Sequence, residues 1–81
     1  MMDIYDELAT RWPSPIVARK EVGRFSGGVL NPRSMANLDS LGEGVPGKFQ
    51  AAPRKIAYPV KELVKWMRDR AAKTKINKEE K

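Results

Sequence analysis

Apolar residues recur with helical spacing in four stretches of the chain, separated by prolines and glycines. The first stretch follows Asp3, a suitable N-cap, and ends at Pro13 and Pro15. Its apolar residues fall about four positions apart, as on one face of a short amphipathic helix: Ile4, Tyr5, Leu8 and Trp12. We therefore predict a short N-terminal helix that ends before residue 13.

The segment after these prolines predicts an extended stretch at residues 16–17 and then a short helix over residues 19–26. Val22 and Phe25 fall on the inward side of this helix. Its outward side is basic and carries Arg19, Lys20 and Arg24. The pair Gly27-Gly28 ends the helix, because glycine readily adopts the backbone conformation that follows a helix C-terminus.

Another helix is predicted over residues 32–41. It is the second of the two helices that Gly27-Gly28 separate, and it is called the second helix below. Asn31 is a good N-cap, and Pro32 suits the first helical position, where its missing N–H costs nothing. At about 100° per residue, Met35 and Leu38 point to one side of this helix. The opposite side carries small and polar residues: Arg33, Ala36, Asn37 and Ser40.

Glycines and a proline between positions 42 and 47 interrupt regular structure, and a hairpin and a third helix are predicted after them. The hairpin joins strands at residues 48–50 and 55–58 through a basic tip. Pro59 opens the helix, whose apolar residues fall at i, i+3, i+4 and i+7: Val60, Leu63, Val64 and Met67. Beyond Ala72 the sequence is highly charged, so we expect a frayed or disordered tail.

The chain has 81 residues, enough for one small domain, and it contains no cysteine and no histidine. Disulfides, Cys/His zinc sites, thiolate nucleophiles and imidazole bases are therefore excluded. The remaining carboxylates, lysines and hydroxyls suit catalysis poorly, so we expect no enzyme, no cofactor and no metal site. Residues 42–47 match the dinucleotide-binding pattern G-x-G-x-x-G, but they follow a predicted helix rather than a strand, which favours a flexible turn.

The formal net charge is +6, and most of it lies in the second half of the chain. Residues 1–18 carry a net charge of −2, whereas residues 44–72 carry +5. A basic half without a broad apolar face favours double-stranded DNA or RNA over a membrane surface as the partner. No apolar run approaches a membrane span, and the acidic start is unlike a signal peptide, so we expect a cytoplasmic, nucleoid-associated protein.

The outward side of the second helix suits readout of DNA bases. Arg33 can donate two hydrogen bonds to guanine, Asn37 can pair in the same way with adenine, and the small Ser40 allows close approach. At the hairpin tip, Arg54 and Lys55 suit contact with a phosphate or the minor groove. The aromatic residues are better explained by core packing than by base stacking: Phe49, Tyr58 and Trp66.

Four short motifs can be compared with a known family: Glu21-Val22-Gly23, Asn31-Pro32-Arg33-Ser34, and the segments 42–46 and 63–67. In that order they resemble the Glu-Val-Ala, Ser-x-x-Thr, Gly-x-(Leu)-Pro and Leu-x-x-Trp-Leu motifs of phage excisionases and AlpA-type regulators. These proteins are small winged helix-turn-helix proteins, grouped with MerR DNA-binding heads and phage terminase small subunits. The resemblance covers residues 16–68. The chain departs from the family at Ala18, where a Ser or Thr cap is usual, and at Leu38, where an aromatic residue is usual.

The resemblance implies that the second helix enters the major groove while the wing contacts the minor groove or the backbone. It assigns DNA contact to Arg33, Ser34, Asn37, Arg54 and Lys55, to which the analysis of the helix face adds Ser40. The implied protein is a prophage-type DNA-binding protein, either an excision directionality factor or a small transcription regulator. Because one such module reads few base pairs, we expect self-association on repeated sites or an integrase or polymerase partner.

The sequence thus predicts an α+β, mostly helical fold: a winged helix-turn-helix with a two-stranded wing and a C-terminal helix. We assign residues 1–15 to an N-terminal extension, 16–70 to the domain and 71–81 to the tail. Three alternatives stay open: DNA recognition like that of a terminase small subunit, an RNA-associated basic protein, and a protein-interaction adaptor. The adaptor would dock through the apolar residues of the extension, Ile4, Tyr5, Leu8 and Trp12.

Overall fold

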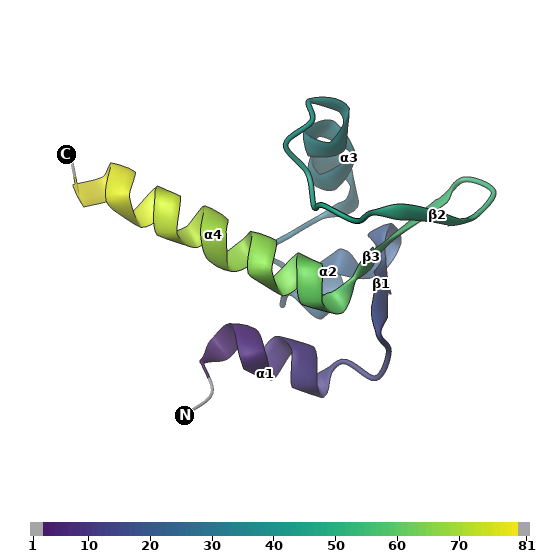
Figure 1. Ribbon diagram of the computed structural model, residues 1–81, viewed down its shortest axis with the longest axis horizontal. Helices are drawn as coiled ribbons and strands as arrows, with labels where there is room; N and C mark the ends of the chain where they lie inside the picture. The colour runs from purple at the N-terminus through teal and green to yellow at the C-terminus, as the bar shows by residue number, and fades with distance from the viewer. Residues whose placement is uncertain (1–2, 80–81) are drawn as a thin grey trace.

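The computed structural model describes residues 3–79, which form four α-helices, one 3-10 turn and a three-stranded antiparallel sheet. In chain order the elements are α1 (Ile4–Arg11), β1 (Ile16–Ala18), η1 (Arg19–Glu21), α2 (Val22–Phe25), α3 (Pro32–Ser40), β2 (Phe49–Ala52), β3 (Lys55–Pro59) and α4 (Val60–Glu79). Figure 1 shows α1 and the long α4 on one side, α3 on the other, and the β2–β3 hairpin projecting from the body. The predicted α+β class is confirmed.

The N-terminal helix α1 begins at the predicted cap. Asp3 Oδ1 accepts a hydrogen bond from the Asp6 backbone N–H at 2.9 Å, which satisfies an N–H group that the helix leaves free. The Asp3 carboxylate also accepts a hydrogen bond from Arg68 of α4, with 3.0 Å between Nη2 and Oδ2. The capping bond, and after it the Arg68 contact, hold the pKa of Asp3 below its ordinary value.

The sheet has β3 at its centre, with β1 and β2 as its edges. Val17 of β1 pairs with Tyr58, and Phe49 of β2 pairs with Ala57. The predicted two-stranded hairpin is therefore joined by a third strand, β1, which contains the predicted extended stretch at residues 16–17. Phe49 was expected in the core but is 40% exposed, and it lies on β2, an edge strand with three exposed residues.

The predicted helix over residues 19–26 divides into η1 and α2. No side chain caps η1, because Ala18 at its N-cap position has no hydrogen-bonding group. The turn after α2 requires glycine, since Gly27 and Gly28 have φ angles of +67° and +92°. α3 then begins as predicted: Asn31 Oδ1 accepts a hydrogen bond from the Ser34 N–H at 2.9 Å.

The core is built from the sheet, α2, α3 and the first part of α4. Pro59 is the last residue of β3, so α4 begins one residue later than predicted. Tyr58 is fully buried and Trp66 is 8% exposed, which confirms their predicted place in the core. Trp66 also donates a hydrogen bond from Nε1 to the carbonyl oxygen of Glu43 at 3.1 Å. The buried cluster comprises Val17, Val22, Phe25, Met35, Val45, Tyr58, Val60, Leu63, Val64 and Trp66.

Two predicted boundaries need correction. α4 does not end near Ala72 but continues to Glu79, so residues 71–79 are a helical continuation rather than a frayed tail. The segment contains no glycine or proline, and its alanines, lysines and single glutamate are good helix formers. Residues 80–81 of the predicted tail lie outside the described residues.

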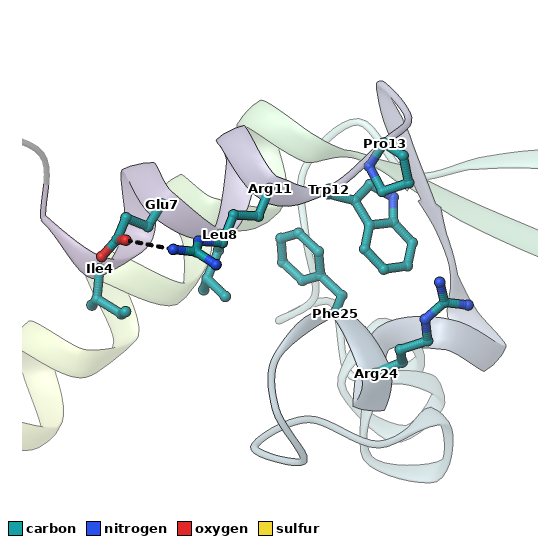
Figure 2. Close-up of a pocket in the computed structure, with 8 residues that line it drawn as sticks. All are labelled: Ile4, Glu7, Leu8, Arg11, Trp12, Pro13, Arg24 and Phe25. Carbon is teal, nitrogen blue, oxygen red and sulfur yellow. Dashed lines mark ion pairs between the residues drawn. The ribbon is translucent and has the colours of Figure 1, made fainter.

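The second correction concerns residues 1–15, which were assigned to an N-terminal extension outside the domain of residues 16–70. Figure 2 shows Trp12 beside Phe25 of α2, edge to face, with ring centroids 5.4 Å apart at an angle of 85°. Trp12 also donates a hydrogen bond from Nε1 to the Ile16 carbonyl oxygen at 2.8 Å. The Arg24 guanidinium lies 5.4 Å from the centre of the Trp12 ring. α1 is therefore an integral part of the packed fold.

Replacing Trp12 with alanine tests this packing. We expect Trp12→Ala to lower the free energy of unfolding by about 3 kcal/mol, because it removes the contact with Phe25 and leaves the Ile16 carbonyl without its donor. Arg11→Ala, at a side chain that is 81% exposed, should change it by less than about 0.5 kcal/mol. Urea denaturation followed by circular dichroism measures both. Equal stability of the two variants would show that α1 does not dock on the core.

Candidate nucleic-acid interface

The outward side of α3 is arranged as the sequence predicts. Met35 is fully buried, and Leu38 packs partly buried against the core. The side chains expected to read bases are exposed at positions i, i+4 and i+7: Arg33, Asn37 and Ser40. Between the first and last of these, α3 advances about 10 Å. Such a face is long enough to follow several base pairs in a major groove.

Ser34 is the fourth residue of α3 that was predicted to contact DNA. Its backbone N–H takes part in the N-terminal cap of the helix. Its N–H is the group that Asn31 caps, at 2.9 Å, while the residue remains exposed beside Arg33. Ser34 is thus fixed at the first turn of α3. Its hydroxyl lies on the flank of the helix, about 100° around the axis from Arg33.

The hairpin tip lies close to the start of α3. Arg54 and Lys55 are both exposed, and with Pro32 they line one cleft between the hairpin and the first turn of α3. Arg33, which follows Pro32, therefore lies at the end of α3 nearest the tip. Ser40 lies at the opposite end. The structure thus brings the tip residues to the first turn of α3 and not to its last.

A polar network that the sequence did not reveal fixes α3 to the rest of the fold. Tyr58 of β3 donates a hydrogen bond from its hydroxyl to Asp39 Oδ2 at 2.9 Å. Arg19 of η1 donates from Nη2 to the same Asp39 oxygen and from Nε to the Tyr58 hydroxyl, the latter at 3.0 Å. The three residues come from three separate elements, so the network joins η1, α3 and β3 directly.

Burial makes this network costly to break. The Asp39 side chain is only 6% exposed, and that of Arg19 is 26% exposed. Burial, which disfavours the phenolate, raises the pKa of Tyr58. The hydrogen bond to Tyr58 and then that to Asp39 raise the pKa of Arg19, so the guanidinium stays charged. A carboxylate left here without the guanidinium would be a buried, unpaired charge.

The loop after α3 closes over Asp39. A Cβ placed at Gly44 would lie 1.7 Å from Asp39 Oδ1, so only glycine fits at this position. Asp39 Oδ1 is buried and has no hydrogen-bond partner among the described residues. Gly42 and Gly47 have φ angles of +78° and +83°, which also favour glycine. All three glycines of the G-x-G-x-x-G match therefore have structural reasons in a loop that follows α3.

Arg19 was predicted on the outward side of a helix with Lys20 and Arg24, but its side chain points inward and bonds to Asp39. The helical pattern suggested the outward side, but residues 19–21 form a 3-10 turn that directs Arg19 toward Asp39. The partners lie 20 and 39 positions further along the chain. No local spacing connects residues so far apart, so only the tertiary structure reveals them.

The residues proposed for an adaptor surface are largely occupied within the fold. Tyr5, Leu8 and Trp12 pack against the core, while Ile4 is 60% exposed. Beside them, a hollow of about 440 Å³ lies between α1 and α2, bordered by the ion pair of Glu7 and Arg11 (Figure 2). Three of the four predicted docking residues thus stabilise this chain itself.

No family model, curated protein or solved structure matches the chain. None of the helices formed by residues 3–79 combines the length and apolar character needed to cross a membrane. Within the same residues, no three acidic side chains come together in a way that could hold a metal ion.

Removing the Asp39 carboxylate tests the network. We expect Asp39→Ala to lower the free energy of unfolding by about 3 kcal/mol, because it leaves the partly buried Arg19 guanidinium without its counter-charge. Ser40→Ala, at the neighbouring exposed position, should change it by less than about 0.5 kcal/mol. Chemical denaturation of both variants measures the difference, and an Asp39→Ala variant as stable as Ser40→Ala would contradict the account.

The raised pKa of Tyr58 gives a second test of the network at alkaline pH. A group whose pKa is higher in the folded state contributes stability that is complete below its unfolded pKa, near 10, and is lost as the pH rises through the folded value. Tyr58→Phe cannot ionise and lacks the hydroxyl contacts. The stability difference between wild type and Tyr58→Phe should therefore shrink as the pH rises above about 10, in urea titrations at each pH. A constant difference would contradict this coupling.

Proposed function

We propose that this protein binds duplex DNA with α3 in the major groove and the β2–β3 hairpin as a wing against the adjacent backbone or minor groove. The observation that carries the proposal is the exposed face of α3, with Arg33, Asn37 and Ser40, beside a hairpin tip that presents Arg54 and Lys55. In this proposal η1, α2 and α3 form a helix-turn-helix, and β2 and β3 form its wing.

Electrostatics supports a polyanionic partner. The chain carries a net charge of +6, and Arg33, Arg54 and Lys55 have no acidic partner within ion-pair distance among the described residues. Uncompensated cations attract the phosphate backbone and release its counterions on binding. Affinity for DNA should accordingly fall steeply with salt.

The anchoring of α3 by side-chain hydrogen bonds supports readout of sequence rather than charge alone. Base-edge hydrogen bonds discriminate only when side chains are held in a defined register, and the Arg19, Asp39 and Tyr58 network anchors α3 from inside. Arg33 would then pair with guanine and Asn37 with adenine, each contributing about 1–3 kcal/mol of discrimination. The network lies behind the reading face and leaves that face free.

The biological role proposed from this binding mode is that of a prophage-type protein, an excision directionality factor or a small transcription regulator. One module of this size contacts few base pairs. Useful specificity would then come from several copies on repeated sites, or from an integrase or polymerase bound nearby. Terminase-like DNA recognition uses the same face of α3 and is the second candidate.

Substituting the base-reading residues separates sequence readout from general attraction. We expect Arg33→Ala and Asn37→Ala each to reduce the preference for a selected duplex over a scrambled one by about fivefold or more, while circular dichroism stays unchanged. The preferred duplex is first selected from a random pool, and fluorescence anisotropy measures both affinities.

Arg11→Ala is the matched control, because it removes one exposed charge on α1, on the opposite side of the molecule from α3 (Figure 1). It should leave the preference unchanged. If the Arg33 and Asn37 variants also keep the full preference, α3 does not read the bases. If the wild-type protein prefers single-stranded DNA or an RNA hairpin to the duplex, the partner class is wrong.

A further inference from the structure

A narrow cleft separates the hairpin tip from η1 and the start of α3. It has a volume of about 160 Å³ and is lined by Ala18, Arg19, Lys20, Pro32, Arg54, Lys55 and Ile56. Drug-sized ligands occupy pockets of about 300 Å³ or more, so this cleft admits only a small group. Four of its seven lining residues are basic, and they come from two segments far apart in the sequence.

Three of these four cations lack a counter-charge. Arg19 is balanced by Asp39, whereas Lys20, Arg54 and Lys55 are exposed and have no acidic side chain within ion-pair distance in residues 3–72. The nearest acid in sequence to Lys20 is Glu21, which pairs with Arg24 at 3.8 Å. Like charges gathered around one cleft repel one another, and an anion placed between them relieves that repulsion.

The backbone at the tip gives an independent reason to look for an anion here. Arg54 is the only residue other than glycine with a positive φ in the described part of the chain, at +61°. A turn with proline first and a positive φ second usually carries glycine at the second position, since a side chain there is strained. An arginine held in this conformation at a cost in stability points to a role for its charge.

We propose that this cleft is a phosphate site, in which Lys20 from η1 and Arg54 and Lys55 from the hairpin tip hold one phosphate of the nucleic-acid backbone. The inference rests on the proposed DNA-binding function and deepens it: one phosphate is clamped between the body and the wing. The guanidinium of Arg54 gives directional hydrogen bonds to phosphate oxygens, and the two lysines add compact charges.

The start of α3 contributes to this site through its dipole rather than through its N–H groups. Pro32 has no N–H, and the Ser34 N–H is bound to Asn31. The positive end of the helix dipole still faces the cleft at Pro32 and favours an anion. Binding at this site therefore depends on the side chains of Lys20, Arg54 and Lys55.

The salt dependence of duplex binding tests whether the cations share one phosphate. We expect Lys20→Ala and Arg54→Gly each to weaken binding about fivefold, the size expected of one exposed ion pair. The triple variant, which also carries Lys55→Ala, removes every cation proposed for the site and should reduce the slope of log K against log salt by about 0.9, the value for one phosphate. Arg11→Ala serves as the control for loss of one charge and should leave the slope unchanged.

The outcomes separate the phosphate site from the proposed function. A slope reduced by about 1.8 or more in the triple variant would mean at least two different phosphates and would overturn the shared site. Unchanged binding in both single variants would also overturn it, while leaving duplex recognition by α3 intact. Absence of any duplex binding by the wild-type protein at low salt would remove the proposed function itself.

Thermal unfolding tests the strain at Arg54 without any nucleic acid. Arg54→Gly relieves the strained backbone, so we expect the melting temperature to rise by about 4 °C while binding weakens. Lys55→Ala, at the neighbouring position, removes a charge without relieving strain and should not raise it. An Arg54→Gly variant that melts at or below the wild-type temperature would contradict the argument from strain.

Discussion

The orientation of α3 depends on the carboxylate of Asp39. α3 buries only Met35 completely, so apolar packing alone holds it weakly, at roughly 2–3 kcal/mol for one buried methionine. Asp39 adds a charged hydrogen bond from Arg19 and a further bond from Tyr58, which tie the helix to η1 and β3. Because these bonds are directional, they fix the rotation of α3 about its axis, and that rotation determines which residues face outward.

The same network determines the charge of the surface around α3. Arg19 is neutralised internally by Asp39, while Lys20 and the two cations of the hairpin tip remain uncompensated beside it. The charge of Arg19 is thus balanced by Asp39, whereas Lys20, the next residue in the chain, remains exposed without a counter-charge. The positive φ of Arg54 shows that the tip is not optimised for stability. Both features agree with a surface that binds an anion.

The order of elements could be predicted from the sequence because its signals are local. Asn31 with Pro32 marks the start of α3, Gly27-Gly28 marks the preceding turn, and the apolar stripe of α4 is regular. The outward residues of α3 followed from the same periodicity. Arg19 could not be placed correctly, because its partners lie 20 and 39 positions away and the turn of η1 breaks the helical pattern. The docking of α1 was missed for a related reason, since the contact of Trp12 with Phe25 is tertiary.

The account claims that one face, formed by α3 and the hairpin tip, meets duplex DNA. Backbone amide NMR spectra of the labelled protein, recorded while a short duplex is added, test this claim most directly. We expect the shifts to concentrate at residues 33–40 and 54–55 and at Lys20, and the amide signals of α1 to stay unchanged. Shifts concentrated in α1 and around the hollow between α1 and α2, with α3 unchanged, would contradict it.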